Sequence, residues 1–229
     1  MTRTRKAIAK SLIVAAAALG LAGTTSSDAQ ACGGAWVPIM EQQIDWRVPG
    51  VARAEKQMDQ GKSVDAAASV VRMMPHIKSL KMSEGKPLVN RAMRVLALSV
   101  ARNDGRLDAA KQLPVSVQDT WVGKTAEDRK VNLAWAVDVL RKTSSAKKDD
   151  PQAQTELAEA LARVDAHQQE AFDILNKLAN KDLVASPEGY ATLAQLKSER
   201  GDKAGTKLAL QRCEAMAKDK ALCSSTARG

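Results

Sequence analysis

The sequence has few aromatic side chains. Its 229 residues include four Trp, one Tyr, one Phe and two His. Proteins that bind single-stranded nucleic acid stack bases on aromatic side chains, and zinc sites draw on several His or Cys at close spacing. The two histidines, His76 and His167, lie far apart, and neither has a second ligand at metal spacing. We therefore expect no metal, no cofactor and no nucleic-acid partner.

Motifs for catalysis are also missing. The chain has no Gly-rich phosphate loop, no GxSxG elbow and no CxxCH haem-attachment sequence. Two carboxylate pairs, Glu156 with Glu159 and Asp149 with Asp150, stand near a predicted helix start, where acidic groups interact favourably with the helix dipole and face water. We expect no catalytic residues, and an enzyme is the least favoured function class.

No apolar run reaches the roughly 20 residues that a membrane-spanning helix needs. Residues 12–22 (LIVAAAALGLA) are apolar, follow a basic start and precede Ala29-Gln30-Ala31, a small-x-small cleavage sequence. These are the three parts of a secretory signal peptide. We expect residues 1–31 to be removed between Ala31 and Cys32, with a periplasmic or extracellular destination. Losing the four Lys/Arg and one Asp of this segment would change the net charge from +9 to +6. A retained amphipathic helix is the alternative.

Cysteine is scarce, with three residues in the chain. In an oxidising compartment cysteines pair, and Cys213 and Cys223 lie ten residues apart near the C-terminus. We predict a disulfide that fixes the tail to the last helix, with two free thiols as the alternative. Cys32, next to the cleavage site, raises the possibility of a lipid anchor. Ordinary cleavage is favoured, because no Leu stands three residues before Cys32 and residues 24–31 are polar or small.

Basic residues gather between residues 72 and 94, where Glu84 is the one acid. We interpret this stretch as a solvated basic face. Contact with an acidic partner or an anionic envelope surface is the alternative. The basic residues are Arg72, Lys78, Lys81, Lys86, Arg91 and Arg94.

From residue 51 onward helix-forming residues dominate, and strand-like alternation is absent. A helix over 51–60 should end at Gly61. A second should begin with Ser63 as its cap and stop at Pro75. Residues 88–103 predict a buried helix, and a short helical run should follow between Leu107 and Pro114.

Thr125 and Asp128 form a capping-box pattern that predicts a helix to about residue 142. Residues 143–150 (TSSAKKDD) are interpreted as a linker and the best place for a hinge. Asp150-Pro151 then predicts a helix start.

The pattern of the C-terminal part predicts two more helix pairs. Its helices are predicted over 152–164, over 169–180, from Ser186 to Gly201 and over 203–218.

The spacing of small and large residues in these pairs resembles that of tetratricopeptide-repeat (TPR) proteins. The resemblance implies an all-α fold, an α-solenoid of antiparallel helix pairs in which small residues let helices approach closely. Only the last pair of turn positions has the expected period, so an irregular helical bundle is the alternative before residue 151. The repeat-packing positions are Ala54, Gly61, Ala66, Ala171, Tyr190, Leu193, Ala194 and Gly201.

The division that follows is a signal peptide (1–31), an extended segment (32–49), irregular helical pairs (50–142), a linker (143–150) and TPR-like pairs with a tail (151–229). Trp36 and Trp46 in the extended segment should be buried over the first helix pair, or else be presented to a partner. We expect an exported module that binds a protein or peptide, or an assembly module of the cell envelope. A lipid-anchored structural lipoprotein of the outer membrane is the alternative.

Overall fold

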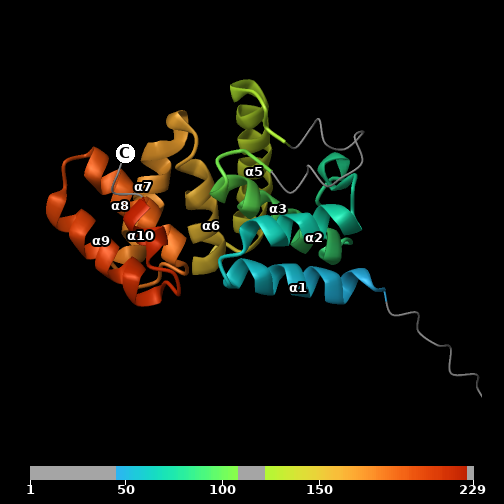
Figure 1. Ribbon diagram of the computed structural model, residues 1–229, viewed down its shortest axis with the longest axis horizontal. Coiled ribbons are helices and arrows are strands. Elements are labelled where there is room, and N and C mark those ends of the chain that lie inside the picture. The colour runs from blue at the N-terminus through green and yellow to red at the C-terminus, as the bar shows by residue number, and fades with distance from the viewer. Residues whose placement is uncertain (1–44, 108–121, 226–229) are drawn as a thin grey trace, which may run out of the picture. The chain divides into compact units, whose positions relative to one another are not determined.

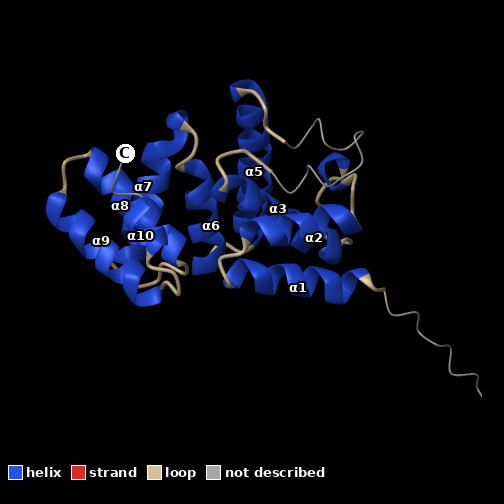
Figure 2. Ribbon diagram, in the orientation of Figure 1, coloured by secondary structure: helices blue, strands red, loops and turns tan. Residues whose placement is uncertain are grey.

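The computed structural model of the chain describes residues 45–107 and 122–225. These residues lie in the compact unit Gln43–Gly229. All their regular elements are helices, and no strand occurs among them (Figures 1 and 2), which confirms the predicted all-α class. The signal peptide, its cleavage site at Ala31 and Cys32, Trp36, and the short helical run after Leu107 fall outside the described residues.

Nine α-helices and two short 3₁₀ helices make up the described part of the chain. They are α1 (Arg47–Asp59), α2 (Ser63–Met73), η1 (Ile77–Ser79), α3 (Pro87–Arg102), α5 (Ala126–Ala146), α6 (Pro151–Leu161), η3 (Asp165–His167), α7 (Gln168–Ala179), α8 (Pro187–Glu199), α9 (Lys203–Met216) and α10 (Ala221–Ser225).

Helices that follow one another in the chain pack against one another (Figure 1). The closest neighbours are α1 with α2, α3 with α5, α6 with α7, and α8 with α9. The first helix of each pair also contacts the first helix of the next, so that α1 touches α3, α3 touches α6, and α6 touches α8. The short helix α10 returns to contact α8 and α9.

Side-chain caps fix several helix starts where the sequence predicted them. Thr125 and Asp128 form a reciprocal capping box at α5, the Asp150 carboxylate accepts from the Gln152 amide, and the Ser186 hydroxyl accepts from the Gly189 amide. Each cap satisfies an amide that has no partner within its own helix. Asp202, which the sequence reading did not single out, caps α9 in the same way.

The start of α1 differs from the prediction. The helix begins at Arg47, four residues before the predicted start, so part of the segment expected to be extended is helical. Pro49 is compatible with this start because an amide in the first helical turn needs no intrahelical partner. Trp46 precedes the helix and is 63% exposed, so the expected burial is wrong for this tryptophan.

Two further boundaries need correction. Helix α5 continues to Ala146, through the first half of the predicted linker, and Thr143 is buried in it. The Thr143 hydroxyl donates to the Val139 carbonyl oxygen at 3.0 Å. Ser63 begins α2 but does not cap it; its hydroxyl instead accepts a hydrogen bond from the Asn103 side-chain amide at 3.2 Å.

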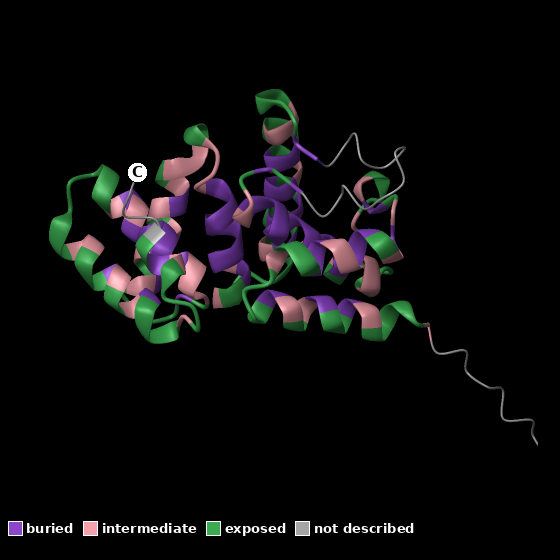
Figure 3. Cartoon of the chain, viewed as in Figure 1, coloured by how far each residue is buried: buried purple, intermediate pink, exposed green. Residues whose placement is uncertain are grey.

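Six of the eight predicted packing positions lie in one buried core that extends from α1 to α10 (Figure 3), while the turn residues Gly61 and Gly201 are exposed. Small residues such as Ala54, Ala66 and Ala171 are fully buried, which allows the close helix approach that their size permits. Gly61 and Gly201 occupy turns with φ of +76° and +75°, a left-handed conformation that favours glycine. The remaining predicted packing residues, Tyr190, Leu193 and Ala194, are also buried.

Candidate functional site

A cavity of about 600 Å³ lies among the first helices of the four pairs. Its walls come from the end of α1, from α3, from α6, from the start of α8 and from the segment 216–222 that leads into α10. Apolar side chains such as Met58, Leu98 and Leu222 alternate there with charged ones. The charged lining residues are Glu55, Asp59, Arg94, Arg102, Glu156, Glu188, Lys218 and Asp219.

Arg94 and Glu156 form one ion pair in the cavity, between α3 and α6. The Arg94 Nε donates to Glu156 Oε2 at 2.6 Å, and its second terminal nitrogen donates to Oε1. Gln152 also donates to Glu156 Oε1, at 3.1 Å. The hydrogen bonds with Glu156 raise the pKa of Arg94. Because the pair is bidentate, it fixes the orientation of both side chains.

Arg102 joins three helices through a second ionic cluster. Its Nε donates to Glu159 Oε2 at 2.8 Å, and its Nη2 donates to Glu159 Oε1 at 3.2 Å. Its Nη1 donates to Glu188 Oε1 at 2.9 Å, so that α3, α6 and the start of α8 are connected by one guanidinium. The Ser186 hydroxyl also donates to Glu159. All three nitrogens of Arg102 are therefore engaged.

The expectation that Glu156 and Glu159 face water is wrong. Each is 3% exposed, and each is neutralised by an arginine of α3. A buried carboxylate needs such a partner because desolvation of an unpaired charge is costly. These two residues, together with Arg102 and Glu188, are site residues that sequence reasoning missed, and Asp150 at the same helix start is a cap that it predicted correctly.

Glu188 is a partly buried carboxylate of the cavity. Burial raises its pKa, and its contact with Arg102 offsets only part of that effect. Glu55, by contrast, receives two hydrogen bonds from Arg91, which lower its pKa. Asp59 and Asp219 lie at the cavity wall and are exposed.

The basic stretch of residues 72–94 is only in part a solvated face. Arg94 lies in the cavity, Arg91 is paired with Glu55, and the Lys78 ammonium donates to the Asn132 side chain at 2.7 Å. Burial lowers the pKa of Lys78. Three of the six basic residues are thus engaged by other helices. Arg91 and Arg94 of α3 pair with α1 and α6, against which α3 packs, and Lys78 of η1 bonds to α5.

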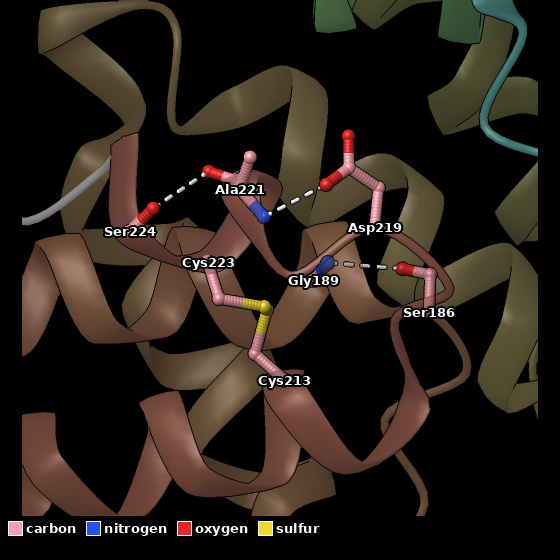
Figure 4. Close-up of a disulfide and its surroundings, with 7 residues drawn as sticks. All are labelled: Ser186, Gly189, Cys213, Asp219, Ala221, Cys223 and Ser224. Carbon is pink, nitrogen blue, oxygen red and sulfur yellow. Dashed lines mark hydrogen bonds between the residues drawn. A yellow bond between two sulfur atoms is a disulfide. The ribbon is translucent and has the colours of Figure 1, made fainter.

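The predicted disulfide between Cys213 and Cys223 is present (Figure 4). It joins the end of α9 to α10, and both residues are buried. The turn between the two cysteines contains Asp219, whose carboxylate points away from the disulfide and accepts a hydrogen bond from the Ala221 amide at 2.9 Å (Figure 4). The disulfide therefore holds one wall of the cavity in place.

Other candidate chemistry is limited in the described residues. No group of three His, Cys, Asp or Glu side chains in residues 45–107 and 122–225 could hold a metal ion. His76 is exposed beside η1, and His167 ends η3, so the structure does not bring them together. No helix of the described segments is both long and apolar enough to cross a membrane.

Comparison with known proteins gives no match to any protein-family model, to any curated protein or to any solved structure.

Proposed function

We propose that the protein is a helical-repeat module that binds a protein or peptide partner in the cavity formed by α1, α3, α6 and α8. The observation that carries this proposal is the order of packing. The first helix of each pair contacts the first helix of the next, and these four helices together line one cavity. Stacked helix pairs of a TPR-like α-solenoid produce a concave surface in this way.

The chemistry of the cavity suits recognition. Its mixture of apolar side chains and fixed ionic groups is typical of sites that bury part of a ligand and orient the rest. Glu156 and Glu159 are each held in a bidentate pair with an arginine of α3, so these charged groups are ordered before a partner arrives. Such preorganisation reduces the entropic cost of binding.

Export to the periplasm or the extracellular space remains part of the proposal. The Cys213–Cys223 disulfide supports it, because disulfides persist mainly in oxidising compartments.

Site-specific photo-crosslinking in the producing cell tests the function. A photoreactive amino acid is placed at Gln152 or Lys218, which line the cavity and are exposed, and at Lys130 of α5 as the control. We expect adducts of defined mass at the two cavity positions and none at Lys130. Equal crosslinking at all three positions, or none at the cavity, would contradict the proposal.

A further inference from the structure

The charges of the cavity are unbalanced toward carboxylates. Together with the ion pairs that support it, the cavity holds six carboxylates and four cationic side chains. The chain as a whole carries the opposite sign, with a net charge of +9. The carboxylates are Glu55, Asp59, Glu156, Glu159, Glu188 and Asp219, and the cations are Arg91, Arg94, Arg102 and Lys218.

The two arginines that line the cavity have few N–H groups left to donate to a ligand. The three nitrogens of Arg102 donate to Glu159 and Glu188. Two nitrogens of Arg94 donate to Glu156, and its third lies 3.9 Å from Glu55 Oε1. An anionic ligand would have to displace these intramolecular carboxylates, which are already placed at hydrogen-bonding distance. These two arginines are therefore poorly prepared to bind an anion.

Three carboxylates of the cavity can still accept hydrogen bonds from a ligand. Asp59 makes no ion pair with any described residue, and the Asp219 carboxylate accepts only the local Ala221 amide within the described part of the chain. One Glu188 oxygen receives the Arg102 hydrogen bond, which leaves the second oxygen without a side-chain donor among the described residues. The raised pKa of Glu188 agrees with this, since burial disfavours its charge more than Arg102 favours it. A cation placed between these groups would compensate them.

We propose that the cavity recognises a cationic segment of its partner, in which a Lys or Arg side chain enters between Glu188, Asp59 and Asp219. The aliphatic stem of such a side chain would contact the apolar lining at Met58 and Leu222, while its charged end reaches the carboxylates. This inference rests on the proposed peptide-binding function and names the chemical class of the partner.

Three synthetic peptides test the proposal against the full folded chain with its disulfide intact. The first is a short blocked peptide of Leu, Ala and Lys, and its two twins carry Glu or Gln in place of every Lys. Fluorescence anisotropy measures the Kd of each. We expect the Lys peptide to bind at least about tenfold more tightly than the Glu twin, and its affinity to fall as salt is raised.

Matched variants test whether the carboxylates of the cavity cause the difference in affinity between the peptides. Asp59→Asn with Asp219→Asn removes two charges at the cavity and keeps the acceptor for the Ala221 amide. The control, Asp138→Asn with Asp173→Asn, removes two exposed charges on α5 and α7 outside the cavity lining. The cavity double variant should weaken binding of the Lys peptide by about tenfold, and the control should change it less than about twofold.

Each other outcome overturns the inference. Tighter binding of the Glu twin would assign recognition to Arg94 and Arg102, and equal binding of all three peptides would assign it to the apolar lining. Absence of binding by all three would reject the cationic class, and the photo-crosslinking at Gln152 and Lys218 would then decide separately whether the cavity binds any partner.

Discussion

Reduction of the Cys213–Cys223 disulfide should lower the free energy of unfolding by about 2.7 kcal/mol. The bond closes a loop with a sequence separation of 10. The chain-entropy relation contains a term of about 1.5R ln n for a loop of n residues. For a loop of this length it predicts that the disulfide removes roughly 9 cal/mol/K of entropy from the unfolded chain, which is about 2.7 kcal/mol at 25 °C. The effect acts through the unfolded chain, which gains freedom when the loop opens.

The same reduction should loosen one wall of the cavity. Helix α10 spans the five residues Ala221–Ser225, and isolated helices shorter than about 12 residues are marginal in water. Without the disulfide, α10 keeps its packing against α8 and α9 but loses its covalent link to α9. Amides of residues 216–225 should therefore exchange with deuterium faster in the reduced protein, while those of α3 and α6 keep their protection.

Urea unfolding followed by far-UV circular dichroism, with and without a phosphine reductant, measures the stability change. The reductant is added to unfolded protein before refolding, because Cys213 and Cys223 are 0% and 1% exposed in the folded chain. The control is Cys213→Ala with Cys223→Ala, whose unfolding should not respond to the reductant. A loss below about 1 kcal/mol together with unchanged exchange over 216–225 would refute the reasoning, because the disulfide would then restrain neither state.

Three further substitutions test the described packing by urea unfolding. Arg102→Ala should cost about 3–5 kcal/mol because it leaves the buried Glu159 and the partly buried Glu188 without their arginine. Arg141→Ala, which breaks an exposed pair, should cost under about 1 kcal/mol, and similar losses would argue against the buried cluster. Gly189→Ala should cost about 1–3 kcal/mol, since its Cβ would lie 2.6 Å from a methyl group of α6, and Gly85→Ala, which has open space, should be near neutral. The pKa of Glu188 is raised in the folded chain, so the contribution of this group is fully present below its unfolded pKa and is lost as pH rises through the folded one. Glu188→Gln should therefore gain stability relative to the unsubstituted chain as pH rises from acid to neutral, and a difference that does not change with pH would show that burial leaves this carboxyl unaffected.

The sequence was informative where a structure depends on neighbours in the chain. Caps and turns are local, so Thr125, Asp150, Ser186, Gly61 and Gly201 could be assigned from residue type and spacing alone. The disulfide was also predictable, because its two cysteines lie on adjacent elements. Helix ends without a strong breaker were less certain, and α5 passes through the polar residues 143–146 because Thr143 bonds back to its own helix.

The cavity could not be predicted in the same way. Glu156 lies in α6 and Arg94 in α3, sixty-two residues apart, so nothing local indicates that they meet. A signal was nevertheless present. Glu156 and Glu159 flank Leu157 and Ala158, which are buried, and a charged residue within a fully buried turn requires a partner from another element. A charged residue at such a position predicts that an oppositely charged partner exists, but which residue is the partner depends on the tertiary structure.

The position of the ionic clusters also bears on their purpose. A buried ion pair adds little net stability, since its desolvation cost is comparable to its electrostatic gain, and apolar residues of similar volume often stabilise as well or better. If these contacts served only to join α3 to α6 and α8, leucines would suffice, and Leu157 and Leu161 are buried in the same helix. Arg94, Arg102, Glu156 and Glu188 instead line the cavity, where they set its charge pattern. Their placement therefore favours recognition of a partner over stabilisation of the fold.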